Sequence, residues 1–245
     1  MSGKSSSSKK QLIREKRRQA RQRQRLVTIL IIVAAALLIT ALLIAPSIQN
    51  RLAPVGSIVP ITPQARPMAD GLAMGDPSAS VTIEVFEDFQ CPACKNFTET
   101  VEPSIVRDYV ATGKVYYIFR QHPFIGNESF RAANASMCAN EQGRFWDYHD
   151  MLFTNWNGEN QGAFTDKRLV AFAEQLNLDM NEFNSCFQSN KYQDAINQDL
   201  AKGQQYGVTS TPSIFVNGKL VTSETPGYVP NYQDIQKAIE AASPG

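Results

Sequence analysis

A run of twenty residues without a charged side chain, Leu26 to Ala45, restricts the architecture of this chain more than any other feature. A helix of that length rises about 30 Å at about 1.5 Å per residue, which matches the hydrocarbon core of a bilayer. The run therefore predicts a transmembrane helix over residues 26–45. A cleaved signal peptide is the alternative, but its apolar region is usually about 7–15 residues long, and Leu43-Ile44-Ala45 fits a small-x-small cleavage site poorly.

Basic residues are concentrated before this run. Residues 1–25 contain ten Lys or Arg and the single acid Glu15, whereas the whole chain carries a net charge of +1. Because positively charged flanks stay in the cytoplasm, we expect a cytoplasmic tail over residues 1–25 and an extracytoplasmic location for everything after Ala45. The tail has no aromatic residues and belongs to no folded face, so the sequence does not indicate a nucleic-acid partner.

The segment after the apolar run is rich in proline. Prolines stand at positions 46, 54, 60, 63 and 67. We expect a semi-extended linker over residues 46–74, with an arm packed on the following domain as the alternative. From Gly75 onward the pattern changes to alternating apolar and polar residues, and we expect a folded domain over residues 75–245.

The expected elements of this domain define an α/β fold in the order β-α-β, helical block, β-β-α. They are strands at 81–86 and 115–119 with a helix between them, helices over about 128–206, strands at 213–216 and 219–222, and a closing helix at 231–242. Pro103 should kink the first helix. Asn217-Gly218 between the last two strands is a strong hairpin signal.

Cys91-Pro92-Ala93-Cys94 lies where the first helix begins, directly after the first strand. The partial positive charge of a helix N-terminus stabilises a thiolate, so Cys91 is the candidate nucleophile and Cys94 the resolving thiol. Pro92 suits the first helical turn, whose N–H groups have no helical partner. Because a stabilised thiolate favours the reduced form, the oxidised pair should donate disulfides.

A zinc site is the competing interpretation of this motif. Structural zinc needs a second close pair of Cys or His, but Cys138 and Cys186 are 48 residues apart, and His122 and His149 are isolated in the sequence. We therefore expect redox chemistry and no metal.

Cys138 and Cys186 have two interpretations of their own. They are either two small buried apolar residues or a structural disulfide. The predicted extracytoplasmic location favours the disulfide, because such compartments are oxidising.

Thr211-Pro212 directly precedes the hairpin. Taken alone, a proline at this place indicates an edge or turn residue. In the expected strand order, however, the strand after Pro212 runs beside the first strand and brings Thr211 and Pro212 against Cys91. A cis peptide bond there would expose the Thr211 backbone to an extended substrate chain.

From about Gly75 to about Ala242 the sequence resembles the DsbA-like branch of the thioredoxin superfamily. The resemblance rests on Cys-Pro-x-Cys after the first strand, on a helical insertion that includes residues 132–149, and on Thr-Pro before the last hairpin. It implies a thioredoxin-like fold that oxidises thiols of exported polypeptides without an organic cofactor. It also implies reoxidation by a quinone-linked membrane protein of the DsbB or VKOR type.

One departure from this pattern concerns proton transfer. Many relatives have a buried acid six residues before the first cysteine, where this chain has Val85. Glu84, Glu87 and Asp88 are near this position but out of register, which leaves the proton-relaying acid unassigned.

Two further departures concern the direction of electron flow. Ala93 replaces the His of the familiar oxidant, which predicts a milder oxidant, and Thr before the critical proline also occurs in isomerases and reductases. The prediction is a membrane-anchored, extracytoplasmic thiol:disulfide oxidoreductase. The alternatives are a reductase or isomerase kept reduced by a membrane donor, and a tethered binding module without redox turnover.

Overall fold

The computed structural model describes residues 23, 25–43 and 55–243 of the 245-residue chain. The chain divides into two compact units between Pro54 and Val55. Most of the basic tail expected over residues 1–25, and linker residues 46–54, lie outside the described part.

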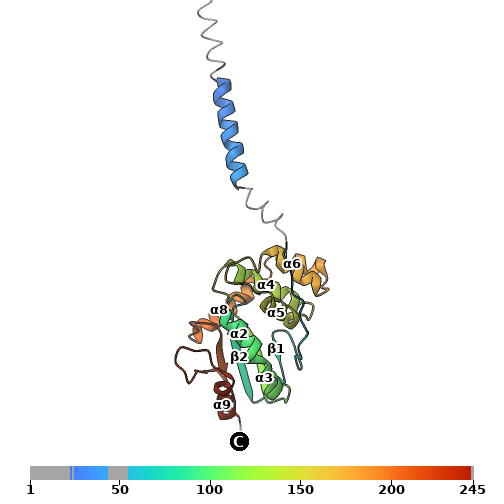
Figure 1. Ribbon diagram of the computed structural model, residues 1–245, viewed down its shortest axis with the longest axis vertical. Coiled ribbons are helices and arrows are strands. Elements are labelled where there is room, and N and C mark those ends of the chain that lie inside the picture. Colours follow the sequence, from blue (N-terminus) through green and yellow to red (C-terminus); the bar gives the residue numbers. More distant parts are fainter. Residues whose placement is uncertain (1–22, 24, 44–54, 244–245) are drawn as a thin grey trace, which may run out of the picture. The chain divides into compact units, whose positions relative to one another are not determined.

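The first unit contains an apolar helix, Arg25–Leu43, of 19 residues. Within the described residues, it is the one helix whose length and composition would allow it to cross a membrane (Figure 1). Its side chains from Arg25 to Leu43 are exposed. The helix agrees with the span expected over residues 26–45, apart from residues 44 and 45, which are not described. Insertion into a membrane stays a prediction.

The described part of the second unit is built on a mixed sheet with the strand order β1-β3-β2-β4-β5. The strands are β1 (Ala73–Met74), β2 (Val81–Glu87), β3 (Val115–Gln121), β4 (Ser213–Val216) and β5 (Lys219–Leu220). β2 pairs in parallel with β3 and antiparallel with β4, as the sequence predicts for the strand after Pro212. The carboxyl end of β2 therefore lies between the carboxyl end of β3 and the start of β4.

Residue type explains why β2 is central. Its sequence, VTIEVFE, is buried at every position except Thr82, whereas β3, VYYIFRQ, alternates buried and half-buried side chains. Val, Ile and Phe favour strands because they pack well on a pleated surface. A strand that is buried on both faces belongs in the middle of a sheet covered on both sides.

The connection from β2 to β3 is helical. It contains α2 (Pro92–Thr100), α3 (Glu102–Ile105) and the π-helical turn η1 (Val106–Val110). A parallel strand pair needs such a crossover to return the chain to the same end of the sheet. The helix is interrupted at Val101, and Pro103 lies in the first turn of α3, close to the expected kink.

A helical insertion separates β3 from β4. Its helices are α4 (Asn127–Asn140), α5 (Phe145–Thr154), α6 (Asp166–Gln175), α7 (Met180–Gln188) and α8 (Gln193–Gln205). These bounds agree with the helical block expected at about 128–206. α4, α5 and α6 gather at one end of the domain (Figure 1). Phe145 and Trp146 of α5 join the insertion to the sheet, because both rings pack against Phe119 of β3.

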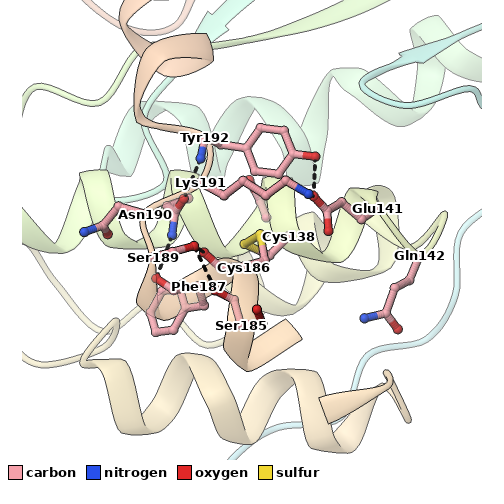
Figure 2. Close-up of a disulfide and its surroundings, with 12 residues drawn as sticks. Cys138, Glu141, Gln142, Ser185, Cys186, Phe187, Ser189, Asn190, Lys191 and Tyr192 are labelled. Carbon is pink, nitrogen blue, oxygen red and sulfur yellow. Dashed lines mark hydrogen bonds and ion pairs between the residues drawn. A yellow bond between two sulfur atoms is a disulfide. The ribbon is translucent and has the colours of Figure 1, made fainter. Parts of the chain in front are cut away.

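Cys138 on α4 and Cys186 on α7 are joined by a disulfide with an S–S distance of 2.03 Å (Figure 2). Both cysteines are buried. Beside the disulfide, the carboxylate of Glu141 accepts a 2.7 Å hydrogen bond from the Tyr192 hydroxyl and pairs with the Lys191 ammonium. The structure thus joins the two cysteines that the sequence pairs.

β4 and β5 form the expected hairpin. Asn217 and Gly218 at its turn have φ angles of 46° and 75°. A two-residue turn with two positive φ angles matches the twist of the strands, and Asn-Gly adopts it readily. Asn217 also ties the hairpin to the start of β2: its side chain accepts a 2.8 Å bond from Thr82 N and donates to Ser80 O.

The helix α9 (Tyr232–Ala242) follows the hairpin. It begins with a capping box, in which the side chain of Asn231 accepts a bond from Asp234 N and the carboxylate of Asp234 accepts one from Asn231 N. Such reciprocal bonds satisfy N–H groups that have no helical partner. Ile235 and Ile239 are buried on one face of this helix.

Residues 55–74 pack along the domain, which is the alternative to the linker expected over residues 46–74. The main chain of Val59 exchanges two hydrogen bonds with the Asn155 side chain, at 2.8 and 2.9 Å. Arg66 forms ion pairs with two buried carboxylates, and β1 adds to the edge of the sheet. Extended proline-rich backbone can therefore serve as a packed arm, and the domain begins at Val55 and not at Gly75. We call residues 55–74 the arm.

The disulfide should contribute to stability without taking part in exchange. It closes a loop of 48 residues, which in the chain-entropy model stabilises the fold by up to about 4 kcal/mol. We expect the Cys138→Ala, Cys186→Ala double variant to melt on the order of 10 °C below the parent in thermal denaturation followed by circular dichroism. A variant that melts like the parent would show that the bridge has no structural role.

Candidate active site

Cys91 and Cys94 lie at the junction of β2 and α2, at the carboxyl end of the central strand. Cys91 is the N-cap residue of α2 with an extended backbone, and Pro92 occupies the first helical turn. Cys91 N donates to Asp88 O at 2.9 Å, which closes the turn between strand and helix. The helix N-terminus is thereby directed at the Cys91 sulfur, as the motif predicts.

Asp88 fixes the position of this turn. One of its carboxylate oxygens accepts a 2.8 Å bond from Gln90 N, and the other accepts bonds from the N–H groups of Phe124 and Ile125 at 2.9 and 3.1 Å. Charge-assisted bonds of this kind are stronger than neutral ones. Asp88 therefore joins the cysteine turn to the loop after β3.

Gln90 anchors the same turn to the helical insertion. Its side chain donates to Ser129 at 2.9 Å and accepts a 2.6 Å bond from Asn160 N, while its carbonyl accepts a 2.8 Å bond from Trp156 Nε1. These partners come from α4 and from the loop after α5. The insertion thus supports the redox motif directly, a role that the sequence did not reveal.

The two thiols have different environments. Cys91 keeps 7% of its surface exposed and Cys94 none. A hydrogen bond from the Cys94 thiol, opposed by burial and assisted by the backbone N–H groups of Cys94 and Ala93, lowers the pKa of Cys91 to about 6. Burial, together with the Cys91 bond and the charge of Glu87, raises the pKa of Cys94 well above its usual range. At neutral pH, Cys91 is a thiolate and Cys94 a thiol.

Thr211 and Pro212 lie beside the first sulfur. β4 pairs with β2 so that Ser213 is opposite Phe86, and the Thr211-Pro212 bond before it is cis. The Cys91 sulfur is 3.3 Å from the carbonyl oxygen of Thr211. The strand order therefore brings together the two motifs, 120 residues apart, that the sequence analysis expects at one site.

The three acids near the motif have separate roles. Glu84 faces away from the thiols, where it pairs with Arg120 at 2.7 Å and with Lys202. Asp88 holds the turn. Glu87 is buried, and neither of its carboxyl oxygens has a hydrogen-bond partner among the residues that the structure describes.

The strand period explains the position of Glu87. Alternate side chains of a strand point to the same face, so Glu87 shares a face with Val85, which occupies the acid's place in relatives. Burial, the nearby charge of Glu102 and the charge of Cys91 raise the pKa of Glu87 well above its usual range. Glu87 is one of the three acids that the sequence leaves unassigned; counting in twos along β2, and not back from the cysteine, distinguishes it from the other two.

Glu87 belongs to a set of buried groups. Potential ligand atoms of Glu87, Glu102 and His149 lie within 4.8 Å of one another, although the sequence gave no sign that His149 would be near an acid. This is the kind of set that can hold a cation. Arg66 already supplies a positive charge there, at 2.5 Å from Glu102, so we assign no metal to it.

Comparison with known proteins agrees with this geometry. A family model described as Thioredoxin matches residues 68–241. The chain belongs to the thioredoxin family. It is 28% identical over 172 residues to the probable disulfide bond formation protein D of Bacillus cereus, covering 69% of this chain and 76% of that protein.

Solved structures give the same result. BdbD from Bacillus subtilis, in its oxidised form, superposes with a TM-score of 0.63 at 25% identity and covers 76% of this chain and 98% of its own. The alpha-DsbA1 protein of Wolbachia pipientis superposes with a TM-score of 0.58 at 26% identity, covering 72% of this chain and 92% of its own. This thioredoxin-family member is a DsbA-like thiol:disulfide oxidoreductase.

The Cys91 pKa leads to a testable pH dependence. In the reduced protein, iodoacetamide should alkylate Cys91 with a midpoint near pH 6, because only the thiolate reacts. The Cys94→Ala variant loses the largest stabilising hydrogen bond, so its midpoint should rise toward the usual thiol range. A parent midpoint above pH 8 would contradict this assignment, and Cys91→Ala, which lacks the thiol, is the control.

Proposed function

We propose that this oxidoreductase introduces disulfides into exported polypeptides through Cys91 and Cys94. The observation that carries the proposal is the asymmetry of the pair, a thiolate at Cys91 beside a fully buried thiol at Cys94. Stabilisation of the Cys91 thiolate favours the reduced pair, and a pair that favours reduction oxidises its partners.

The exchange balances in two steps. A client thiolate attacks the Cys91 sulfur of the oxidised pair, a mixed disulfide forms, and Cys94 leaves as a thiolate. A second client thiolate then attacks the client sulfur of the mixed disulfide, and Cys91 leaves as the stabilised thiolate. The client gains one disulfide and loses two protons and two electrons, and the pair gains both electrons.

Glu87 supplies the proton that this sequence requires. The raised pKa of Cys94 means that its thiolate must be protonated as it leaves. Burial and the charge of Glu102 raise the pKa of Glu87 well above its usual range, which suits it to carry this proton. It donates that proton to Cys94 during oxidation of the client and accepts it when Cys94 attacks.

Thr211 and Pro212 shape the surface that meets the client. The proposal is supported by the 3.3 Å distance from the Thr211 carbonyl to the Cys91 sulfur. A client chain that pairs with this backbone would present its own sulfur to Cys91. Ala93 and Pro92 border the same surface from the start of α2.

The direction of electron flow is testable in solution. We expect the oxidised protein to form a disulfide in an equimolar reduced peptide, and its reduction potential against glutathione to lie above about −200 mV. A potential near about −270 mV would favour the reductase alternative. Cys94→Ala should accumulate reducible adducts with client proteins and Cys91→Ala should not. If neither variant forms adducts, the redox role itself is wrong.

We further propose that the helix Arg25–Leu43 anchors the protein with its catalytic domain outside the cytoplasm. The proposal is supported by the length and composition of the helix and by the ten Lys or Arg among residues 1–25. A membrane partner must then return the pair to the disulfide, since every oxidised client leaves it reduced. The quinone-linked reoxidant of the DsbB or VKOR type stays a prediction.

Protease accessibility tests this topology. Protease added to spheroplasts should digest residues 55–245, because they lie on the outer side of the membrane. A cytoplasmic protein of the same cells serves as the control and should remain intact until the membrane is lysed. Protection of the domain before lysis would overturn the proposed location.

A further inference from the structure

Five charged or titratable groups form a buried charge cluster behind the thiols. Its members are Arg66, Glu87, Glu102, His149 and Asp150. The side chain of Arg66 is 8% exposed, that of Glu102 1% and that of Asp150 7%. Burial of this extent makes an unpaired charge costly, so the protonation of each member depends on the others.

Arg66 connects two of the acids. Its Nη1 lies 2.5 Å from a carboxylate oxygen of Glu102 and its Nη2 lies 2.7 Å from a carboxylate oxygen of Asp150. Its guanidinium also lies over the ring of Trp146, 4.6 Å from the centroid. A planar guanidinium can bridge two carboxylates in this way, whereas an ammonium group cannot keep the same geometry.

Each bridged acid also accepts a bond from a neighbour. The Tyr117 hydroxyl donates to the other oxygen of Glu102 at 3.0 Å, and His149 Nδ1 lies 2.9 Å from Asp150. Burial opposes ionisation of Asp150, but the bond with His149 and the charge of Arg66 lower its pKa. Glu102 and Asp150 are therefore the two acids of the cluster whose carboxylate oxygens have ion-pair and hydrogen-bond partners.

Glu87 differs from these two acids. Among the described residues neither of its oxygens has an ion pair or a hydrogen bond of normal geometry, although the Thr98 hydroxyl is near enough to oppose the rise of its pKa, and Glu102 and His149 lie within reach. The cluster thus has three acids against one guanidinium and the imidazole of His149. A buried region accommodates this imbalance most readily if one acid holds a proton, and the acid without a partner is the one that does so.

We propose that Arg66 is a proton-positioning residue, which keeps the exchangeable proton of the buried charge cluster on Glu87 by holding the other two acids as carboxylates. The proposal rests on the proposed function, in which Glu87 exchanges that proton with Cys94. It assigns a chemical role to the arm, which the sequence analysis expects as a linker. The arm supplies the cation that decides which acid is protonated.

The groups that face the cluster come from every element packed around it. They are Arg66 of the arm, Glu87 of β2, Cys91 and Cys94 at the start of α2, Glu102 of α3, Tyr117 of β3, and His149 and Asp150 of α5. Arg66 is the one permanent positive charge among them. Its removal should therefore make the cluster bind an additional proton.

Infrared spectroscopy can count the protonated carboxyls, because their C=O stretch is separate from that of carboxylates. In the reduced parent at pH 7 we expect one buried protonated carboxyl, which Glu87→Gln removes. Arg66→Met should show one additional protonated carboxyl, and this second band should persist in the Arg66→Met, Glu87→Gln variant. A single band in Arg66→Met that Glu87→Gln abolishes would overturn the proposal.

Loss of Arg66 leaves buried charges without a partner, so Arg66→Met could fail to fold. The charge-balanced variant Arg66→Met, Glu102→Gln removes one cation and one acid together. It should return to one protonated carboxyl, located on Glu87. Two bands in this variant, or none, would contradict the assignment.

The dependence of stability on pH gives a second measurement. If Arg66→Met holds an extra proton that the unfolded chain lacks at pH 7, its folding takes up one more proton than that of the parent. Its stability should then fall more steeply than the parent's as the pH rises above the usual range of a glutamate. Parallel pH profiles would count against the proposal.

Two outcomes separate this inference from the proposed function. If Glu87→Gln leaves the rate of Cys94 attack on a Cys91 mixed disulfide unchanged, the proton transfer by Glu87 is wrong, whereas the infrared count still tests Arg66. If the parent shows the protonated carboxyl only after a chelator is added, a cation occupies the cluster, and the role of Arg66 is wrong.

Discussion

The parallel pairing of β2 with β3, with β4 antiparallel on the other edge of β2, gathers three distant segments at one end of the sheet. The cysteine turn follows β2, the loop held by Asp88 follows β3, and Thr211 precedes β4. Each segment is short, and its own sequence does not indicate which other segments it contacts. The backbone ladder sets their relative positions, so the redox site depends on strand register before it depends on any side chain.

Burial raises the pKa of both active-site thiols, but hydrogen bonds outweigh it at only one of them. At the start of α2, hydrogen-bond donors outweigh burial and keep Cys91 ionised. One turn further, Cys94 has no exposed surface and keeps its proton. Behind it, Arg66 pairs with Glu102 and Asp150, and burial raises the pKa of Glu87, which has no ion pair, well above its usual range. The ionised and the neutral sulfur are thus one helical turn apart. Their pKa values differ because different hydrogen-bond partners are available to each sulfur.

Local signals predicted much of the fold and of the site. Cys91-Pro92-Ala93-Cys94, Thr211-Pro212 and Asn217-Gly218 each require a particular backbone, and the structure has the turn, the strand entry and the hairpin at those places. Glu87 could not be told apart from Glu84 and Asp88 in the sequence, because its burial is set by segments far along the chain, among them α5 with His149. The packed arm was only the alternative to a linker, because its ion pairs join Arg66 to residues 36 and 84 positions away. No pattern within residues 55–74 marks such partners.

The disulfide between Cys138 and Cys186 lies within the insertion and apart from the redox pair in sequence. Its formation removes two electrons and two protons from the newly made chain. Each copy that contains this bridge has therefore consumed two oxidising equivalents. The protein is in this respect a product of the chemistry that its family performs, and the formation of its bridge depends on oxidising capacity that already exists where the chain folds.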